Sequence, residues 1–354
     1  MAAPSQNGHN QTTDEADVAS VFGRHPATAG ARLARQCWEA LQRGYTSLRD
    51  MGGYGCEIAL AVDEGTIVGP NIYSAGAYLS QTAGHGDIFE LPAGDVLLNY
   101  GIGHMKAGQY GATIGCICDG TDECRRAVRL QIRRGANCIK YSHQFSEEEL
   151  KAIVDEASRM ERPVAAHVHG KKGIVAAVKA GVTSVEHVSF ADEECIKLIK
   201  ERGTIYIATR TIIELLLQTG GKGLPKSIWE KAQFCGSNHV KAYELAIKSG
   251  VTIALGTDTP PGFNMAVELD YSVQAGMSNL EAIKAATANG PLTVKGQAPK
   301  SGQLKVGYTA AMIGVCKNPV EEDVKFLRNK ENIKWVWKGG KLFKGPNIGP
   351  WGED

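Results

Sequence analysis

The sequence of 354 residues predicts an α/β fold, a (β/α)8 barrel of the TIM type, followed by a small β-domain. Between residues 120 and 290, strand-length apolar runs alternate with helix-length segments, and units of this size imply a parallel sheet. Seven predicted strands follow one another and no G-x-G-x-x-G motif opens a helix, which favours a barrel over a doubly wound sheet. We expect a tail at 1–28, the barrel at 29–291 and the β-domain portion at 292–354.

Composition excludes several classes of protein. The net charge of +1, with 43% hydrophobic and 22% charged residues, is that of an average globular chain and predicts no nucleic acid or membrane partner. No apolar run reaches the about 18 residues that a membrane span needs. The first 20 residues are polar and lack the apolar core of a signal peptide, so we expect a cytoplasmic, reducing location. Nine cysteines, scattered through apolar segments, are expected to be buried thiols.

Few helices and strands are predicted in the N-terminal third of the chain. Leu33, Cys37 and Leu41 recur at helical spacing, so a helix is expected from Ala29 to the glycine at 44. A strand at 45–49, a helix at 57–64 and a strand at 71–75 follow, and then a long glycine-bearing loop from Tyr78 to about Gly111.

The regular part of the chain begins at residue 122. Ser146 and Glu149 form a capping box at the start of one of its helices. The predicted helices are 122–134, 146–160, 173–180, 192–202, helical material up to 249, 265–275 and 280–289. The predicted strands are 138–141, 164–167, 184–188, 204–209 and 251–255, and the extended pieces after residue 291 are 302–304, 308–315, 333–337 and 340–343.

Polar residues close four of the apolar strand runs. In a barrel, reactive side chains lie at the C-terminal ends of the strands. These strand ends carry Lys140, His167, His187 and Asp258. Taken one at a time, each has an ordinary interpretation: a surface lysine, a core histidine or a helix N-cap. Four such residues on four strands of one barrel instead predict a metal or acid–base site. His169 lies two residues after His167, so the alternation of side chains along a strand places both imidazoles on the same face of the sheet.

This order of residues, Lys, then His-x-His-Gly, Glu-His and Gly-Thr-Asp, resembles the amidohydrolase superfamily of metal-dependent hydrolases. The similarity is closest to its ochratoxinase and prolidase-like members. It extends over G-T-I-V-G-P-N-I-Y-S (65–74), L-S-Q-T-A-G-H-G-D-I-F (79–89), I-A-L-G-T-D-T (253–259) and V-W-K-G-G-K-L-F-K-G-P (336–346), from about residue 20 to the C-terminus.

The resemblance implies a hydrolase that uses one or two zinc ions. It implies that Lys140 is carboxylated and binds metal, that His167 and His187 bind the second ion, and that Asp258 binds the first ion and acts as the catalytic base. Zinc accepts such nitrogen and oxygen ligands and lowers the pKa of bound water toward neutrality. His85, His169 and Arg210 are expected to face the substrate, a small-molecule amide or peptide.

The sequence departs from the family pattern in two places. Family members begin the barrel with a strand ending in His-x-His, and no His-x-His occurs before His167 here. Relatives also have a longer loop after Lys140. The resemblance therefore implies an N-terminally incomplete barrel, unless 18–22 supplies a strand, with strand edges that favour a homo-oligomer.

Three interpretations stay open on these grounds. The chain is a metal-dependent amidohydrolase of the carboxypeptidase or prolidase type. Alternatively, it is a catalytically impaired relative with a ligand-binding or accessory role in fungal secondary metabolism. In the third interpretation it is a truncated gene model of an active enzyme.

Overall fold

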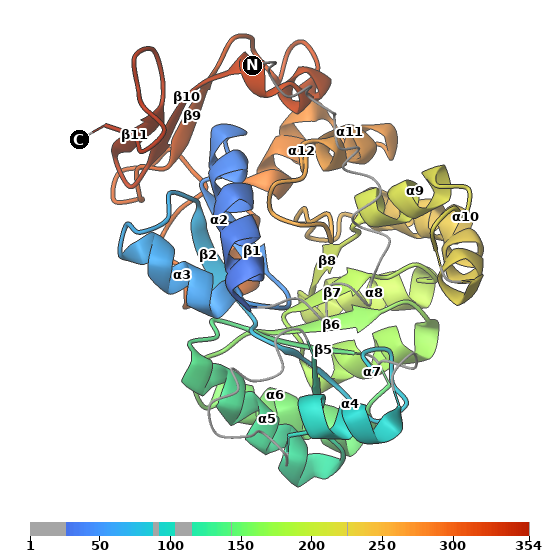
Figure 1. The fold of residues 1–354 in the computed structure, drawn as a ribbon. Helices are drawn as coiled ribbons and strands as arrows, with labels where there is room; N and C mark the ends of the chain where they lie inside the picture. The colour runs from blue at the N-terminus through green and yellow to red at the C-terminus, as the bar shows by residue number, and fades with distance from the viewer. Residues whose placement is uncertain (1–25, 88–91, 103–114, 143, 225, 354) are drawn as a thin grey trace.

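The computed structural model describes residues 26–87, 92–102, 115–142, 144–224 and 226–353. Its centre is a parallel sheet of six strands in the order β4-β3-β5-β6-β7-β8, with helices packed around it (Figure 1). The strands are β3 (Tyr78–Ser80), β4 (Gly115–Ile117), β5 (Ile139–Ser142), β6 (Val164–Val168), β7 (Ser184–His187) and β8 (Ile205–Ile207). The predicted α/β class is confirmed.

Two further strands, β1 (Ser47–Asp50) and β2 (Asn71–Ser74), form a separate parallel pair. A buried ion pair links this pair to the central sheet. Arg49 of β1 donates from Nη2 to Glu186 Oε1 (2.8 Å) and from Nη1 to Ser184 Oγ (3.0 Å), both on β7. β1 and β7 are therefore held facing each other through their side chains.

The last predicted barrel strand, 251–255, forms one parallel bridge, from Ile253 to Tyr206 of β8. It lies beside β8 in the order a barrel requires. Within the described ranges, no strand pairs with both this segment and β1, so the ladder of hydrogen bonds does not close. The segment 18–22, which the sequence offered as a substitute strand, lies outside the described residues.

Helices follow the strands as the sequence predicts. Ser146 accepts the backbone N–H of Glu149 and the Glu149 carboxylate accepts that of Ser146, so the predicted capping box is confirmed. The helices are α2 (Pro26–Gln42), α3 (Gly55–Asp63), α4 (Ala93–Tyr100), α5 (Gly120–Arg134), α6 (Glu147–Ser158), α7 (Lys171–Ala180), α8 (Glu193–Arg202), α9 (Arg210–Gln218), α10 (Lys226–Lys248), α11 (Val267–Gln274) and α12 (Asn279–Ala286). None of the helices in the described part of the chain is long and apolar enough to cross a membrane.

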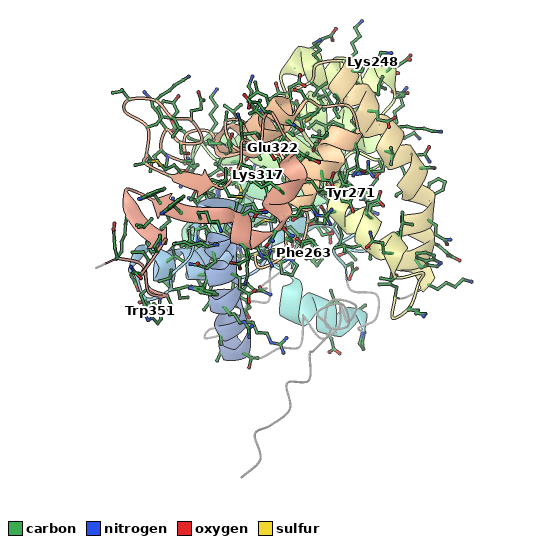
Figure 2. All side chains as sticks on the ribbon, turned by 90° about the horizontal axis from the view of Figure 1, so that it is seen from above. Lys248, Phe263, Tyr271, Lys317, Glu322 and Trp351 are labelled. Carbon is green, nitrogen blue, oxygen red and sulfur yellow. The ribbon has the colours of Figure 1, made fainter. Side chains whose placement is uncertain are left out.

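The C-terminal segment forms a small antiparallel sheet, β11-β10-β9, as expected for the β-domain portion. Its strands are β9 (Met312–Val315), β10 (Ile333–Lys338) and β11 (Lys341–Lys344). This sheet packs on α2, where Leu41 is buried with Ile333 and Val336. Figure 2 shows Lys317 and Glu322, which form an ion pair of 2.8 Å after β9.

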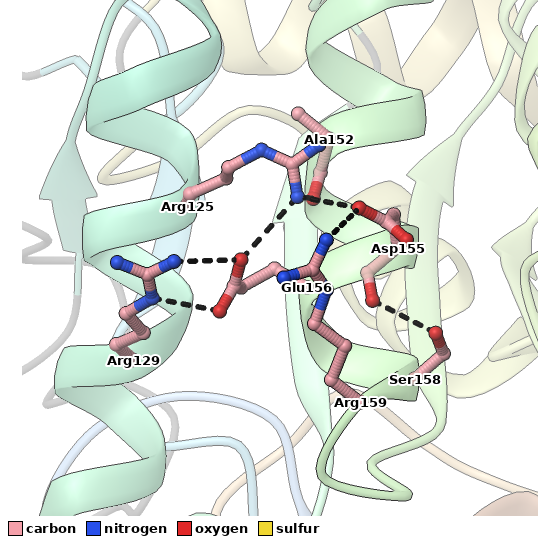
Figure 3. A network of polar contacts seen from close by, with 7 residues as sticks. All are labelled: Arg125, Arg129, Ala152, Asp155, Glu156, Ser158 and Arg159. Carbon is pink, nitrogen blue, oxygen red and sulfur yellow. Dashed lines mark hydrogen bonds and ion pairs between the residues drawn. The ribbon is translucent and has the colours of Figure 1, made fainter.

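Helices α5 and α6 are joined by a network of charged side chains (Figure 3). Arg129 donates two hydrogen bonds to the carboxylate of Glu156, at 2.7 and 3.1 Å. Arg125 reaches Asp155 at 2.6 Å and Glu156 at 3.3 Å. These pairs hold together the two helices that follow β4 and β5.

Two sequence predictions about the fold were wrong. The loop predicted from Tyr78 to about Gly111 contains β3 and α4, and β4 follows it unpredicted. Strands of three residues are too short to show an alternation pattern, so the sequence carried no signal for them. The extended piece predicted at 302–304 is not a strand.

The thiol prediction was nearly right. Eight cysteines are buried, and Cys316 is exposed.

Candidate metal and active site

Three histidines come together at the C-terminal edge of the central sheet. His167 lies on β6 and His169 follows the end of that strand, with ring centroids 4.8 Å apart. His187 ends β7, and its ring lies 4.4 Å from that of His167 and 5.0 Å from that of His169. One potential ligand atom from each ring lies within 4.8 Å of the others. The three side chains can therefore converge on one metal ion.

The backbone around this edge is strained. His187 and Val188 have φ values of +69° and +58°, and Thr209 and Asp258 follow the two next strands at +52° and +56°. Non-glycine residues in this left-handed region cost about 1–3 kcal/mol each, and they cluster at functional sites. All four residues lie where barrel strands end.

Burial keeps two histidines of the cluster, His167 and His187, neutral. The pKa values of His167 and His187 lie well below the usual value, first because both rings are desolvated and then because of the neighbouring histidines and Lys140. A neutral imidazole is the form that binds a metal. His167 and His187 are therefore already deprotonated at neutral pH.

The proton on His187 can be placed from its hydrogen bonds. The Thr209 hydroxyl donates to the Ala208 carbonyl at 2.6 Å. Because a hydroxyl has one proton to give, Thr209 Oγ1 must accept from His187 Nδ1, which lies 2.6 Å away. Nε2 of His187 then carries the lone pair, and this buried atom has no hydrogen-bond partner among the described residues. A hydrogen bond of this kind at the far nitrogen is typical of metal-binding histidines.

His169 is held by a second chain of hydrogen bonds. Its Nδ1 lies 2.8 Å from Ser189 Oγ, and Ser189 Oγ lies 2.9 Å from Nδ1 of His239. Ser189 and His239 are fully buried, and burial lowers the pKa of His239 to about 4. Cys235, one turn earlier on α10, also lies against Ser189. His239 was not singled out from the sequence, since a lone histidine in a helix gives no signal.

His85 and Lys140 border the cluster. The ring of His85 stacks on His167 with centroids 4.1 Å apart, and its backbone N–H donates to Gln144 at 2.5 Å. Lys140 of β5 places its ammonium 5.8 Å from the centroid of the Tyr78 ring. Its positive charge also acts on His167 and His187.

Arg210 begins α9 and is buried. Its guanidinium lies 5.2 Å from the centroid of the Tyr271 ring and donates from Nη2 to Glu214 at 2.5 Å. Its Nε is buried with no hydrogen-bond partner in the ranges described. Glu268 of α11 accepts the backbone N–H groups of Arg210 and Thr211, which fixes the start of this helix.

The structure brings most of the predicted residues together. His167, His169 and His187 form the cluster, with His85 and Lys140 against it. Asp258 follows the segment that pairs with β8, and its side chain is exposed. It does not belong to the group of described residues whose ligand atoms converge.

A histidine cluster at the C-terminal edge of a parallel α/β sheet lies where the active sites of barrel enzymes are found. The sequence profile of the Amidohydrolase family matches residues 10–343, and the chain belongs to this family. Membership assigns it to the hydrolases that act on amide bonds.

The chain is also similar in sequence and structure to particular proteins. The chain is 59% identical to ochratoxinase from Aspergillus niger over 353 residues, which is 96% of this chain and 73% of that protein. The crystal structure of A. niger ochratoxinase superposes with a TM-score of 0.91, covering 96% of this chain and 81% of the other. A prolidase complexed with N-methylphosphonate-L-proline superposes with a TM-score of 0.80 at 28% identity, covering 91% and 81%.

Proposed function

We propose that this chain is a metal-dependent amidohydrolase. Its reaction would release a C-terminal amino acid from a small-molecule amide or peptide, as an ochratoxinase or a prolidase does. The observation that carries the proposal is the cluster of His167, His169 and His187, because His187 offers a buried lone pair without a partner among the described residues. The relatives support the same class of substrate.

Zinc is the proposed metal. In this assignment His167 and His187 are nitrogen ligands, Lys140 adds an oxygen ligand after carboxylation, and Asp258 adds a carboxylate. Carboxylation would also replace the positive charge of Lys140, which opposes a cation beside the two rings. One or two ions would be held, and the position of the second ion is the better supplied with ligands, namely Lys140, His167 and His187.

The bound metal would supply a hydroxide at neutral pH and polarise the amide carbonyl. The protein supplies position and proton transfer. Asp258 is proposed to take the proton of the attacking water and to return it to the departing amine. Arg210, buried and partly unpaired at Nε, is proposed to bind the substrate carboxylate. His85 and the exposed part of His169 would face the substrate.

A catalytically impaired protein with a ligand-binding or accessory role is the second candidate. The exposure of Asp258 and its place outside the converging group favour this alternative, because the base would then stand away from the metal. We also propose a cytoplasmic homo-oligomer with no nucleic acid partner.

Metal analysis and hydrolysis of an N-aroyl amino acid together test the proposal. We expect about one zinc per chain in purified protein, and turnover that a chelator removes and zinc restores. His187→Ala should abolish both zinc and turnover, whereas the matched surface change Lys317→Gln should leave both unchanged. Zinc without turnover would favour the ligand-binding role, and a protein that binds no metal would refute the proposal.

A further inference from the structure

The start of α9 is capped in an uncommon way. An N-cap serine or aspartate normally accepts a backbone N–H of the first turn, as Ser146 does for α6 and Asp192 for α8. Thr209 is the N-cap of α9 but makes no such bond, and its backbone is left-handed, with φ +52° and ψ +45°. Its hydroxyl instead donates to the Ala208 carbonyl and accepts from Nδ1 of His187, each at 2.6 Å. The residue that would cap the helix therefore serves the histidine cluster.

A carboxylate from another helix caps α9 in its place. Glu268 of α11 accepts the backbone N–H of Arg210 at 2.8 Å and that of Thr211 at 2.9 Å, and it also accepts the Thr211 hydroxyl. Glu268 and Thr211 are 1% exposed and Arg210 is 7% exposed, so these N–H groups lie away from water. The N–H of Thr211 is the second of the helix, which an N-cap hydroxyl ordinarily serves. Glu268 thus supplies the bond that Thr209 does not make.

The two arrangements depend on each other. Without Glu268, the N–H of Thr211 would be a buried donor without an acceptor, and such donors are rare in folded proteins. The Thr209 hydroxyl is the acceptor that the helix start itself offers. A turn of this hydroxyl toward the helix would take it away from His187.

The orientation of the His187 ring rests on that hydroxyl. Nδ1 is bonded to Thr209, and the buried Nε2 has no hydrogen-bond partner among the described residues. The bond at Nδ1 therefore fixes both the tautomer of the ring and the direction of the lone pair at Nε2.

We propose that Glu268 is a positioning residue of the candidate metal site, which caps α9 from α11 so that the Thr209 hydroxyl can orient His187. The inference deepens the proposed function and rests on it where His187 is taken as a metal ligand. It adds α11, which carries none of the predicted site residues, to the elements that build the site.

The tautomer of His187 in the metal-free protein tests the proposal without zinc. Nitrogen NMR of histidine-labelled protein distinguishes a ring protonated at Nδ1 from one protonated at Nε2, and the His187 signal is assigned by its absence from His187→Gln. We expect protonation at Nδ1 in the wild-type protein. Thr209→Val and Glu268→Leu should both remove this preference, whereas Thr209→Ser, which keeps the hydroxyl, should retain it.

Zinc affinity, measured by competition with a chromophoric chelator, gives the size of the effect. Loss of a partner behind a ligand weakens metal binding by about 10- to 100-fold, and we expect this loss in Thr209→Val and in Glu268→Leu. Because both changes remove the same hydrogen bond of His187, the double variant should bind zinc within about 3-fold of Thr209→Val alone. Two independent effects would multiply instead.

The matched control is Tyr243→Phe, which removes another buried hydrogen bond to α11, from Tyr243 to Ser272 at 2.8 Å. It should leave the tautomer and the zinc affinity unchanged. Glu268→Gln keeps one acceptor oxygen and serves if the leucine variant does not fold; it should shift both measurements in the same direction by less.

Two results would overturn the positioning role. One is a wild-type tautomer and zinc affinity in the Glu268 variants, and the other is a double variant whose effects multiply. A protein that binds no zinc but loses the Nδ1 tautomer in Glu268→Leu would refute the proposed function and still support the positioning of His187.

Discussion

The ion pair between Arg49 and Glu186 is expected to be the most sensitive polar contact of the barrel. The Arg49 side chain is 12% exposed and that of Glu186 is 5% exposed, and Ser184 Oγ donates to the same carboxylate oxygen at 2.7 Å. Arg49→Met would leave the Glu186 charge buried without its cation. Breaking a buried pair by removing one partner costs about 3–5 kcal/mol.

Removing both charges should cost much less than removing one. Apolar replacement of a whole buried ion pair is often neutral in stability. We therefore expect Arg49→Met with Glu186→Leu to lie within about 2 kcal/mol of wild type, and a coupling energy of several kcal/mol in the double-mutant cycle. Urea unfolding of the four proteins measures this.

The matched control is an exposed pair at the C-terminal end of α6, between Asp155 and the C-cap residue Arg159. Arg159 and Asp155 lie 3.2 Å apart but are 60% and 42% exposed, so Arg159→Met should cost less than about 1 kcal/mol. If Arg49→Met were equally mild, or if the double variant were as unstable as the sum of the single ones, the reasoning would be wrong. Because Glu186 pairs in register with His167 and precedes His187, the single variants should also weaken zinc binding.

Three other predictions follow from separate parts of the structure. Burial raises the pKa of the Glu268 carboxyl from 4.5 to about 7. The stability that this residue contributes is therefore full below pH 4.5 and is lost as the pH rises through 7. Glu268→Gln should lower the free energy of unfolding in urea more at pH 5 than at pH 8. A Cβ at Gly55 would collide with the Asp50 carboxylate and Ser74 Oγ (2.6 Å), so Gly55→Ala should lower the melting temperature, whereas Gly30→Ala on α2, with open space around it, should raise it slightly. Arg210→Met should raise KM for a substrate with a free carboxylate by about 10-fold or more and leave KM for its methyl ester unchanged, as steady-state kinetics would show.

Sequence reasoning found the residues that close apolar strands. His167 and His187 could be predicted because each is a polar residue that closes a short apolar run of strand length. The grouping of His169 with His167 follows from the alternation of side chains along a strand. The helices were predictable too, since capping residues and apolar periodicity act locally.

The residues that contact the site residues from distant elements could not be predicted from the sequence. His239 contacts Ser189 only because α10 folds back over the end of β7. A contact between residues fifty positions apart produces no periodic pattern in the sequence. The pairing of Arg49 with Glu186 depends on β1 facing β7 in the same way. β3 and β4 were missed because three residues do not define a pattern, and neighbouring strands rather than propensity set them.

The left-handed residues at His187, Val188 and Thr209 have a thermal consequence. Their unfavourable backbone energy, about 1–3 kcal/mol each, is tolerated because buried contacts such as those of Val188 restrain them, and we expect a local relaxation of this rim to release that energy. On heating, the ligand geometry should relax before the protein unfolds globally. Inactivation is therefore expected several degrees below the melting temperature, and bound metal should narrow that gap.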